Sequence, residues 1–123
     1  MNHNTAPYTN INLKLLSMPT PDQVTTQLRK VIDPEMGINI VDMGLIYDIN
    51  IVPQPDMPDK YKVIVIMTLT SPGCPLASLI DDLVTSTVGQ LPDIQSVYID
   101  LTFDPPWNIG KMTAAARAEL GFF

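Results

Sequence analysis

Cys74, the only cysteine of the 123-residue chain, is the side chain best suited to chemistry. It stands in the sequence Thr-Ser-Pro-Gly-Cys-Pro at positions 70–75, between a stretch typical of a buried strand and one with helical periodicity. The pattern predicts Cys74 at the N-cap of that helix or just before it, where free N–H groups and the helix dipole stabilise an anion. A thiolate there is the form that reacts and binds metals. The alternative is a buried structural cysteine, the commoner fate of a lone thiol.

A cysteine enzyme needs further groups, and the sequence offers none of them. The one histidine, His3, lies in the N-terminal tail, so a Cys–His pair is not expected. A phosphatase loop of the C-x5-R type would need an arginine at the position of Ile80, and no phosphate-binding G-x-x-x-x-G-K-[ST] string occurs. One cysteine and one histidine cannot supply the about four ligands of a closed zinc site or an iron–sulfur cluster. We therefore predict no catalytic residues and no enzyme.

Three carboxylates, Asp33, Glu35 and Asp42, cluster between the first predicted helix and the first predicted strand. As hard oxygen ligands they could bind a cation or help a thiolate to hold iron. The alternative is that they only form turns, since Asp before Pro is a common turn former. Both interpretations remain open from the sequence.

The single tryptophan, Trp107, follows Asp-Pro-Pro after the last predicted strand. It could offer a rigid aromatic surface to a partner protein. It could also clamp this segment onto the core, as a lone tryptophan usually does.

Thirteen acidic residues against seven basic ones give a net charge of −6, and the basic residues are scattered. This balance disfavours binding to nucleic acid through its phosphates. The N-terminus has neither the basic nor the apolar region of a signal peptide, and no apolar run approaches the ~20 residues that span a bilayer. We expect no membrane association and a cytoplasmic location, with 46% hydrophobic residues forming one globular domain.

The helices that must position these residues are indicated by apolar spacing. Residues 1–20 are rich in Asn, Thr and Pro and are expected to form a flexible tail. The first helix begins near Pro21 with Thr20 as N-cap, buries Val24, Leu28, Val31 and Ile32, and ends at Asp33-Pro34. A second helix over residues 75–90 carries an apolar face made of Leu76, Leu79, Ile80, Leu83, Val84, Thr87, Val88 and Leu91. A last helix is predicted over residues 110–120.

Three strands are expected at residues 45–52, 61–70 and 94–103. The first alternates, with Leu45, Tyr47, Ile49 and Ile51 on one face. The proline-rich residues 53–58 are expected to be a long loop that joins the first two strands. The element order α-β-β-α-β-α predicts an α+β fold, a two-layer sandwich with a small three-stranded mixed sheet and helices on one face.

Three separated motifs, VIDPEMGINIVDMGLIYDINI, MTLTSPGCPLASLIDDLV and LTFDPPWNIGKMTAAARAELG, occur in order over residues 21–123. Together they resemble the SUF-type iron–sulfur cluster assembly accessory proteins, the SufT-like metal–sulfur cluster biosynthesis family, which is related to PaaD-like proteins. The resemblance implies an α+β domain that assists iron–sulfur cluster assembly or delivery. It implies that Cys74 is the family's motif cysteine, within an element that begins at Thr70, and that Asp33, Glu35 and Asp42 fall on further motif positions.

The resemblance further implies that the protein acts with iron–sulfur scaffold and client proteins and binds no cofactor stably. A cluster or iron would be held transiently by Cys74 and shared with a partner, a second protomer or glutathione, so a homodimer is one arrangement left open. An adaptor that docks partners without touching metal is the alternative. A PaaD-like oxygenase maturation factor is a further alternative, which the lack of a cysteine-rich C-terminal extension disfavours.

Overall fold

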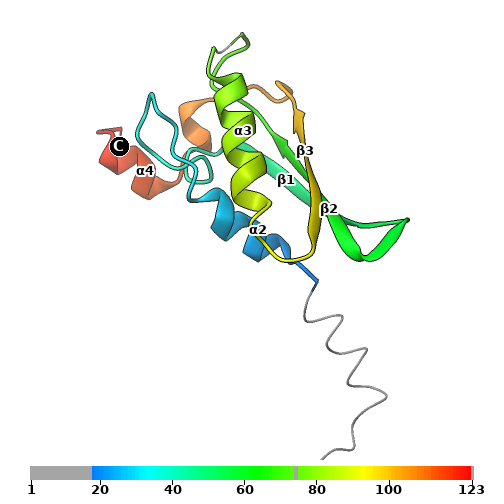
Figure 1. Ribbon diagram of the computed structural model, residues 1–123. Coiled ribbons are helices and arrows are strands. Elements are labelled where there is room, and N and C mark those ends of the chain that lie inside the picture. The colour runs from blue at the N-terminus through cyan, green and yellow to red at the C-terminus, as the bar shows by residue number, and fades with distance from the viewer. Residues whose placement is uncertain (1–17, 74, 123) are drawn as a thin grey trace, which may run out of the picture.

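The computed structural model describes residues 18–73 and 75–122 as one layer of helices on one small sheet (Figure 1). The elements follow the predicted order α-β-β-α-β-α, with one short 3-10 helix added before the last helix. They are α2 (Pro21–Leu28), β1 (Ile46–Gln54), β2 (Met57–Met67), α3 (Ala77–Val88), β3 (Ile94–Leu101), the 3-10 helix η1 (Ile109–Lys111) and α4 (Ala114–Glu119).

The sheet has the order β1-β2-β3, with β2 antiparallel to β1 and parallel to β3. Helices α2 and α3 both cover the same side of it (Figure 1). The predicted mixed three-stranded sheet in an α+β fold is therefore confirmed.

The core lies between the sheet and these two helices. Alternate residues of β2 point into it, because successive side chains of a strand face opposite sides. Tyr61, Val63, Val65 and Met67 are buried on this side. From α2 and α3, the residues Val24, Leu28, Ile80, Val84 and Val88 complete the layer, as their helical spacing predicted.

The N-terminus of α2 forms as expected. The side-chain oxygen of Thr20 accepts from the N–H of Gln23, while the Gln23 side chain accepts from the N–H of Thr20. This reciprocal pair is a capping box.

The predicted C-terminal end of α2 is wrong. The helix ends at Leu28, and a tighter turn follows in which the N–H of Val31 donates to the carbonyl of Leu28. Val31 is still buried, but Ile32 is 47% exposed and pairs with Asn39 in an isolated bridge. The early turn rotates Ile32 away from the core.

The predicted long loop over residues 53–58 is also wrong. Strand β1 runs through Pro53 to Gln54, β2 begins at Met57, and only two residues turn between them. Proline is tolerated here because an antiparallel ladder uses the N–H of only every second residue on each strand. The ladder also slips in register between Pro53 and Gln54.

In both β1 and α3, fewer apolar side chains face the core than the sequence predicted. In β1 the register shifts between Ile46 and Asp48, and this bulge removes Tyr47 from the inward series. The Tyr47 hydroxyl instead donates to the carbonyl of Pro105, 2.7 Å away. In α3, Leu79 is 45% exposed because the sheet contacts a narrower stripe than the apolar residues occupy.

Element ends differ as well. Helix α3 starts at Ala77, so Pro75 precedes it, and β3 ends at Leu101, short of the predicted residue 103. The predicted last helix is divided into η1 and α4, and the Thr113 hydroxyl caps α4 by accepting from the N–H of Ala116. Among the described residues, no helix has the length and apolar character needed to cross a bilayer.

Candidate functional site

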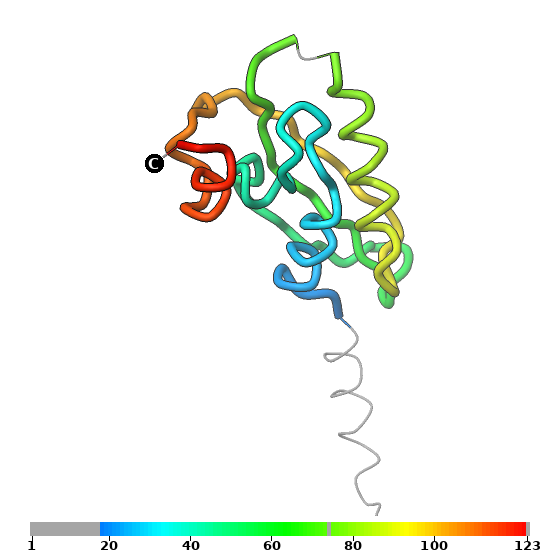
Figure 2. Tube along the Cα trace, turned by 90° about the vertical axis from the view of Figure 1, so that its left-hand side faces the viewer, coloured from blue at the N-terminus to red at the C-terminus, as the bar shows by residue number. Residues whose placement is uncertain are grey.

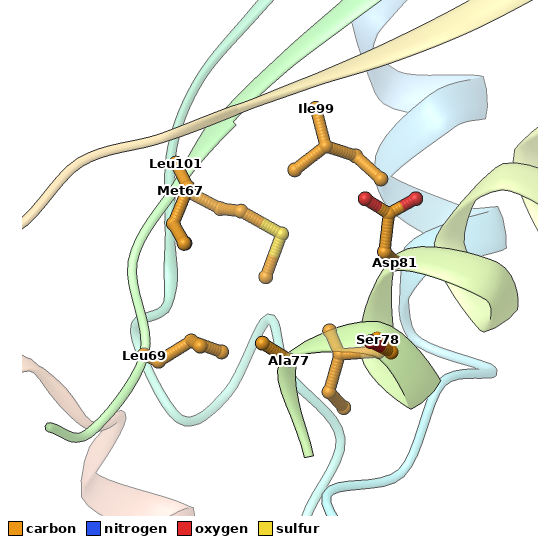
Figure 3. A pocket seen from close by; sticks show the side chains of 8 residues that line it. Met67, Leu69, Ala77, Ser78, Asp81, Ile99 and Leu101 are labelled. Atoms are coloured by element: carbon orange, nitrogen blue, oxygen red, sulfur yellow. The ribbon is translucent and has the colours of Figure 1, made fainter. Parts of the chain in front are cut away.

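A hollow of about 190 Å³ lies where the carboxyl ends of the parallel strands β2 and β3 meet the first turns of α3. Its lining is mostly apolar and includes Met67, Leu69, Ala77, Ile99 and Leu101. Figure 3 shows the thioether of Met67 and the side chain of Ile99 pointing into it, with the carboxylate of Asp81 at one side. The crevice beyond the carboxyl ends of parallel strands is a common place for binding in α/β sheets.

The segment that carries the cysteine, residues 70–76, begins and ends beside this hollow. Leu69 and Ala77, on either side of residues 70–76, both line it. Thr70 is half-buried, and Gly73 has a positive φ of 76°. Cys74 itself lies outside the described residues, so its predicted role stays a prediction.

The start of α3 fixes the position of Cys74 in sequence relative to the helix. The N-cap residue is Leu76, so Cys74 stands two positions before it, which agrees with a place just before the cap. The side chain of leucine has no acceptor atom, so Leu76 cannot cap the N–H groups of the first turn of α3. The first N–H groups of this helix therefore have no side-chain cap at that position, and such groups favour a nearby anion.

The carboxylate of Asp33 organises the turn that follows α2. Asp33 is buried, and its Oδ1 atom accepts from the N–H groups of Glu35, at 2.8 Å, and Met36, at 3.1 Å. The Glu35 side chain is exposed. This geometry is that of an Asx turn, the structural alternative that the sequence left open.

Asp42 is engaged in a second turn of the same loop. Its Oδ2 atom accepts from the side-chain amide of Asn39, 2.9 Å away. Asp42 also lines a second, polar hollow of about 170 Å³, together with Glu119 of α4. Within residues 18–73 and 75–122, no three His, Cys, Asp or Glu side chains lie together in a way that could hold a metal ion.

Residues 42–44 form a platform for the C-terminal segment, which the sequence did not predict. The carbonyl of Asp42 accepts from the N–H of Thr113 at 2.9 Å, and the carbonyl of Met43 accepts from the Trp107 indole N–H at 2.7 Å. Next to them, Gly44 lies directly against the backbone of Lys111. The only sequence signal for this contact was Gly44 itself, since glycine often marks a close backbone approach.

Trp107 is thus half-buried and packs against the core through this platform. This geometry matches the interpretation in which Trp107 holds its segment onto the core. The prediction that Trp107 binds a partner protein stays a prediction. The loop with Asp33 and the segment before α3 lie at the same end of the molecule, opposite the β1–β2 hairpin (Figures 1 and 2).

Comparison with known proteins assigns this arrangement to a family. Residues 21–101 match the family described as "Iron-sulfur cluster assembly protein". The Fe-S protein maturation auxiliary factor YitW of Bacillus subtilis (strain 168) is 37% identical over 100 residues, covering 81% of this chain and 92% of that protein. The Fe-S protein maturation auxiliary factor SufT of Staphylococcus aureus (strain USA300) is 40% identical over 91 residues, covering 74% and 97%.

The fold agrees with these sequence matches. The crystal structure of a domain of unknown function, DUF59, from Bacillus anthracis superposes with a TM-score of 0.72 at 28% identity, covering 93% of this chain and 100% of that one. The family resemblance carried by the three sequence motifs is therefore confirmed. This chain belongs to the iron–sulfur cluster assembly protein family.

Proposed function

We propose that this protein is a non-enzymatic accessory factor that assists iron–sulfur cluster assembly or delivery to client proteins through the thiolate of Cys74. The names of its relatives, Fe-S protein maturation auxiliary factors, support a role in this process. The observation that carries the proposal is the apolar hollow lined by Leu69 and Ala77, the residues that flank the segment bearing Cys74.

The size and lining of the hollow favour a protein partner over a small substrate. At about 190 Å³ it is smaller than the ~300–1,000 Å³ typical of small-molecule sites. An apolar side chain of a scaffold or client protein fits its character, with Leu101 and Met67 as walls. Docking there would bring the partner beside residues 70–76.

A thiolate in this segment is supported by the helix that follows it. The N-terminal end of α3 carries positive partial charge and lacks a side-chain cap from Leu76, and both favour an anion nearby. A thiolate is a soft ligand suited to iron–sulfur clusters. The cluster is cargo here, and Cys74 would supply one of its ligands, with the others from a partner, a second protomer or glutathione.

A fully folded Cys74→Ser variant tests the thiolate. We expect normal partner binding, reduced activity of iron–sulfur client enzymes in cells, and no absorbance of a bound cluster after anaerobic reconstitution. The control is Ser71→Ala in the same segment, which leaves the thiol in place. Normal client activity with Cys74→Ser refutes the thiolate and leaves an adaptor that docks partners without metal.

The docking step has its own matched pair of variants. Leu101 and Leu79 are almost equally exposed, at 44% and 45%, but only Leu101 lines the hollow. Leu101→Glu is expected to weaken binding of a scaffold or client protein at least about tenfold, while Leu79→Glu leaves it unchanged. Equal effects of the two variants would show that the hollow is not the docking site.

A further inference from the structure

The side of the sheet that faces away from α2 and α3 has no described helix on it (Figure 1). Its central strand presents Ile64 and Ile66, which are half-buried although neither packs against the core cluster. On the neighbouring strand, Tyr98 is 54% exposed. An antiparallel sheet can leave one face in water, but that face then usually carries polar residues. Here the central strand places two isoleucines, Ile64 and Ile66, in the middle of the face.

The charges on this face are sorted into rows across the strands. The pairing register places Asp48, Ile66 and Asp100 side by side in one row, with the two carboxylates flanking the isoleucine. The next row on the same face contains Asn50, Ile64 and Tyr98, and the row beyond it contains Lys62 between Val52 and Ser96. Acidic and basic groups therefore lie on opposite sides of the row centred on Ile64.

Lys62 is already oriented over this face. Its ammonium lies 5.3 Å from the centroid of the Tyr98 ring, a cation–π distance. Within residues 18–73 and 75–122, neither Asp48 nor Asp100 forms an ion pair. On this face, the nearest basic side chain of the three strands is Lys62, two rows away. Each row corresponds to two residues along a strand, about 6.7 Å, so the separation is roughly 13 Å.

We propose that this face, centred on Ile64 and bounded by Lys62, Asp48 and Asp100, binds a second copy of this chain. The two-fold axis lies between the two sheets, along the Ile64 row and perpendicular to the strands. The two faces then pack on each other with their strands running in opposite directions. This arrangement brings the Lys62 row of one copy over the Asp48–Ile66–Asp100 row of its partner. The ammonium of Lys62 in each copy then lies between two carboxylates of the other copy, and the two Ile64 rows contact each other.

The pattern fits a second copy because a two-fold interface must be complementary to itself. The order of an acidic row, the Ile64 row and a basic row meets that condition when one copy is rotated by 180° about the Ile64 row. About nine side chains on three strands are well below the ~20–30 residues per side of a standard interface. We therefore expect a weak, reversible dimer, with a dissociation constant in the micromolar range or above.

The dimer has a consequence for the cysteine segment. Since the strands of the two copies run in opposite directions, the two copies of residues 70–76 lie at opposite ends of the assembly. Both apolar hollows stay open, because they lie on the helix side of each sheet. This dimer would present two separate Cys74 segments to partners and would not join them at one cluster.

Charge reversal in complementary variants tests the interface on the full chain, by sedimentation equilibrium from about 10 µM to 1 mM in the presence of reductant. Lys62→Glu alone and Asp48→Lys/Asp100→Lys alone each place like charges against one another, and each should weaken dimerisation at least about tenfold. An equimolar mixture of the two should restore it to within about threefold of wild type. The control Lys30→Glu changes the net charge equally, from an exposed position near the end of α2, and should leave the dimer intact.

Three outcomes overturn the proposal. The first is a wild-type protein that stays monomeric up to 1 mM. This is also the result expected if a different partner or the N-terminal residues occupy the face. The second is a dimer that survives both charge reversals. The third is a mixture that stays monomeric although circular dichroism shows both variants folded.

Discussion

Gly44 is the position where a single added methyl group should do most damage to the fold. It has a φ of +79°, a region that side-chain-bearing residues rarely adopt. A Cβ atom there would lie 2.6 Å from the carbonyl carbon of Lys111 and 2.8 Å from its Cβ, and it would overlap the carbonyl oxygen of the same residue. Because the obstacle is largely backbone, no change of rotamer relieves it.

The cost of Gly44→Ala separates into two parts. The left-handed conformation costs an alanine about 1 kcal/mol. Forcing an extra carbon into a closed contact costs about 2 kcal/mol more, within the range measured for overpacked cores. We expect a total loss of about 3 kcal/mol in the free energy of unfolding, out of the ~5–15 kcal/mol typical of a domain.

Gly37 provides a matched control for the conformational part. Its φ is +70°, and no heavy atom lies within 4 Å of a Cβ built there. Gly37→Ala should therefore lose only about 1 kcal/mol. The effect of alanine on the entropy of the unfolded chain is common to both variants and cancels in the comparison.

Urea unfolding followed by circular dichroism measures both variants against wild type. The expected difference between them is about 2 kcal/mol, with similar m-values. If Gly44→Ala and Gly37→Ala lose the same stability within ~0.5 kcal/mol, the contact with Lys111 does not hold the C-terminal segment in place and the reasoning fails.

Two further changes test the loops by the same urea assay. Trp107→Phe keeps an aromatic ring but removes the N–H that donates to the carbonyl of Met43, and it should cost about 1–2 kcal/mol; no loss would contradict the clamp. Asp33→Ala removes the acceptor for the N–H groups of Glu35 and Met36 and should cost about 1–2 kcal/mol, while Glu35→Ala, at an exposed position, should stay within ~0.5 kcal/mol. Equal effects at the two acidic positions would show that the Asx turn contributes nothing.

These contacts show which of the three sequence motifs pack against one another in the structure. The Asp42-Met43-Gly44 element receives the segment that begins with Asp104-Pro105-Pro106-Trp107, so two motifs distant in sequence form one structural unit. The motif with Cys74 forms a separate unit with the hollow. A variant of the first unit is expected to act through stability, and a variant of the second through function.

The sequence by itself determined the elements whose signals are local. The apolar spacing of α2 and α3 and the Thr20 cap each depend on neighbours within a few residues, and each appears in the structure. The solitary Cys74 before a helix and the three motifs were also readable, and they were sufficient to identify the family.

Tertiary structure decided what depends on residues far apart in the chain. The platform at residues 42–44 meets partners more than sixty residues away, and such a contact leaves no periodic signal. The exposure of Leu79 and the outward turn of Tyr47 follow from how narrow a stripe the sheet contacts and from a bulge in its register. The hollow beside residues 70–76 likewise exists only because β2, β3 and α3 converge there, and that convergence is a property of packing.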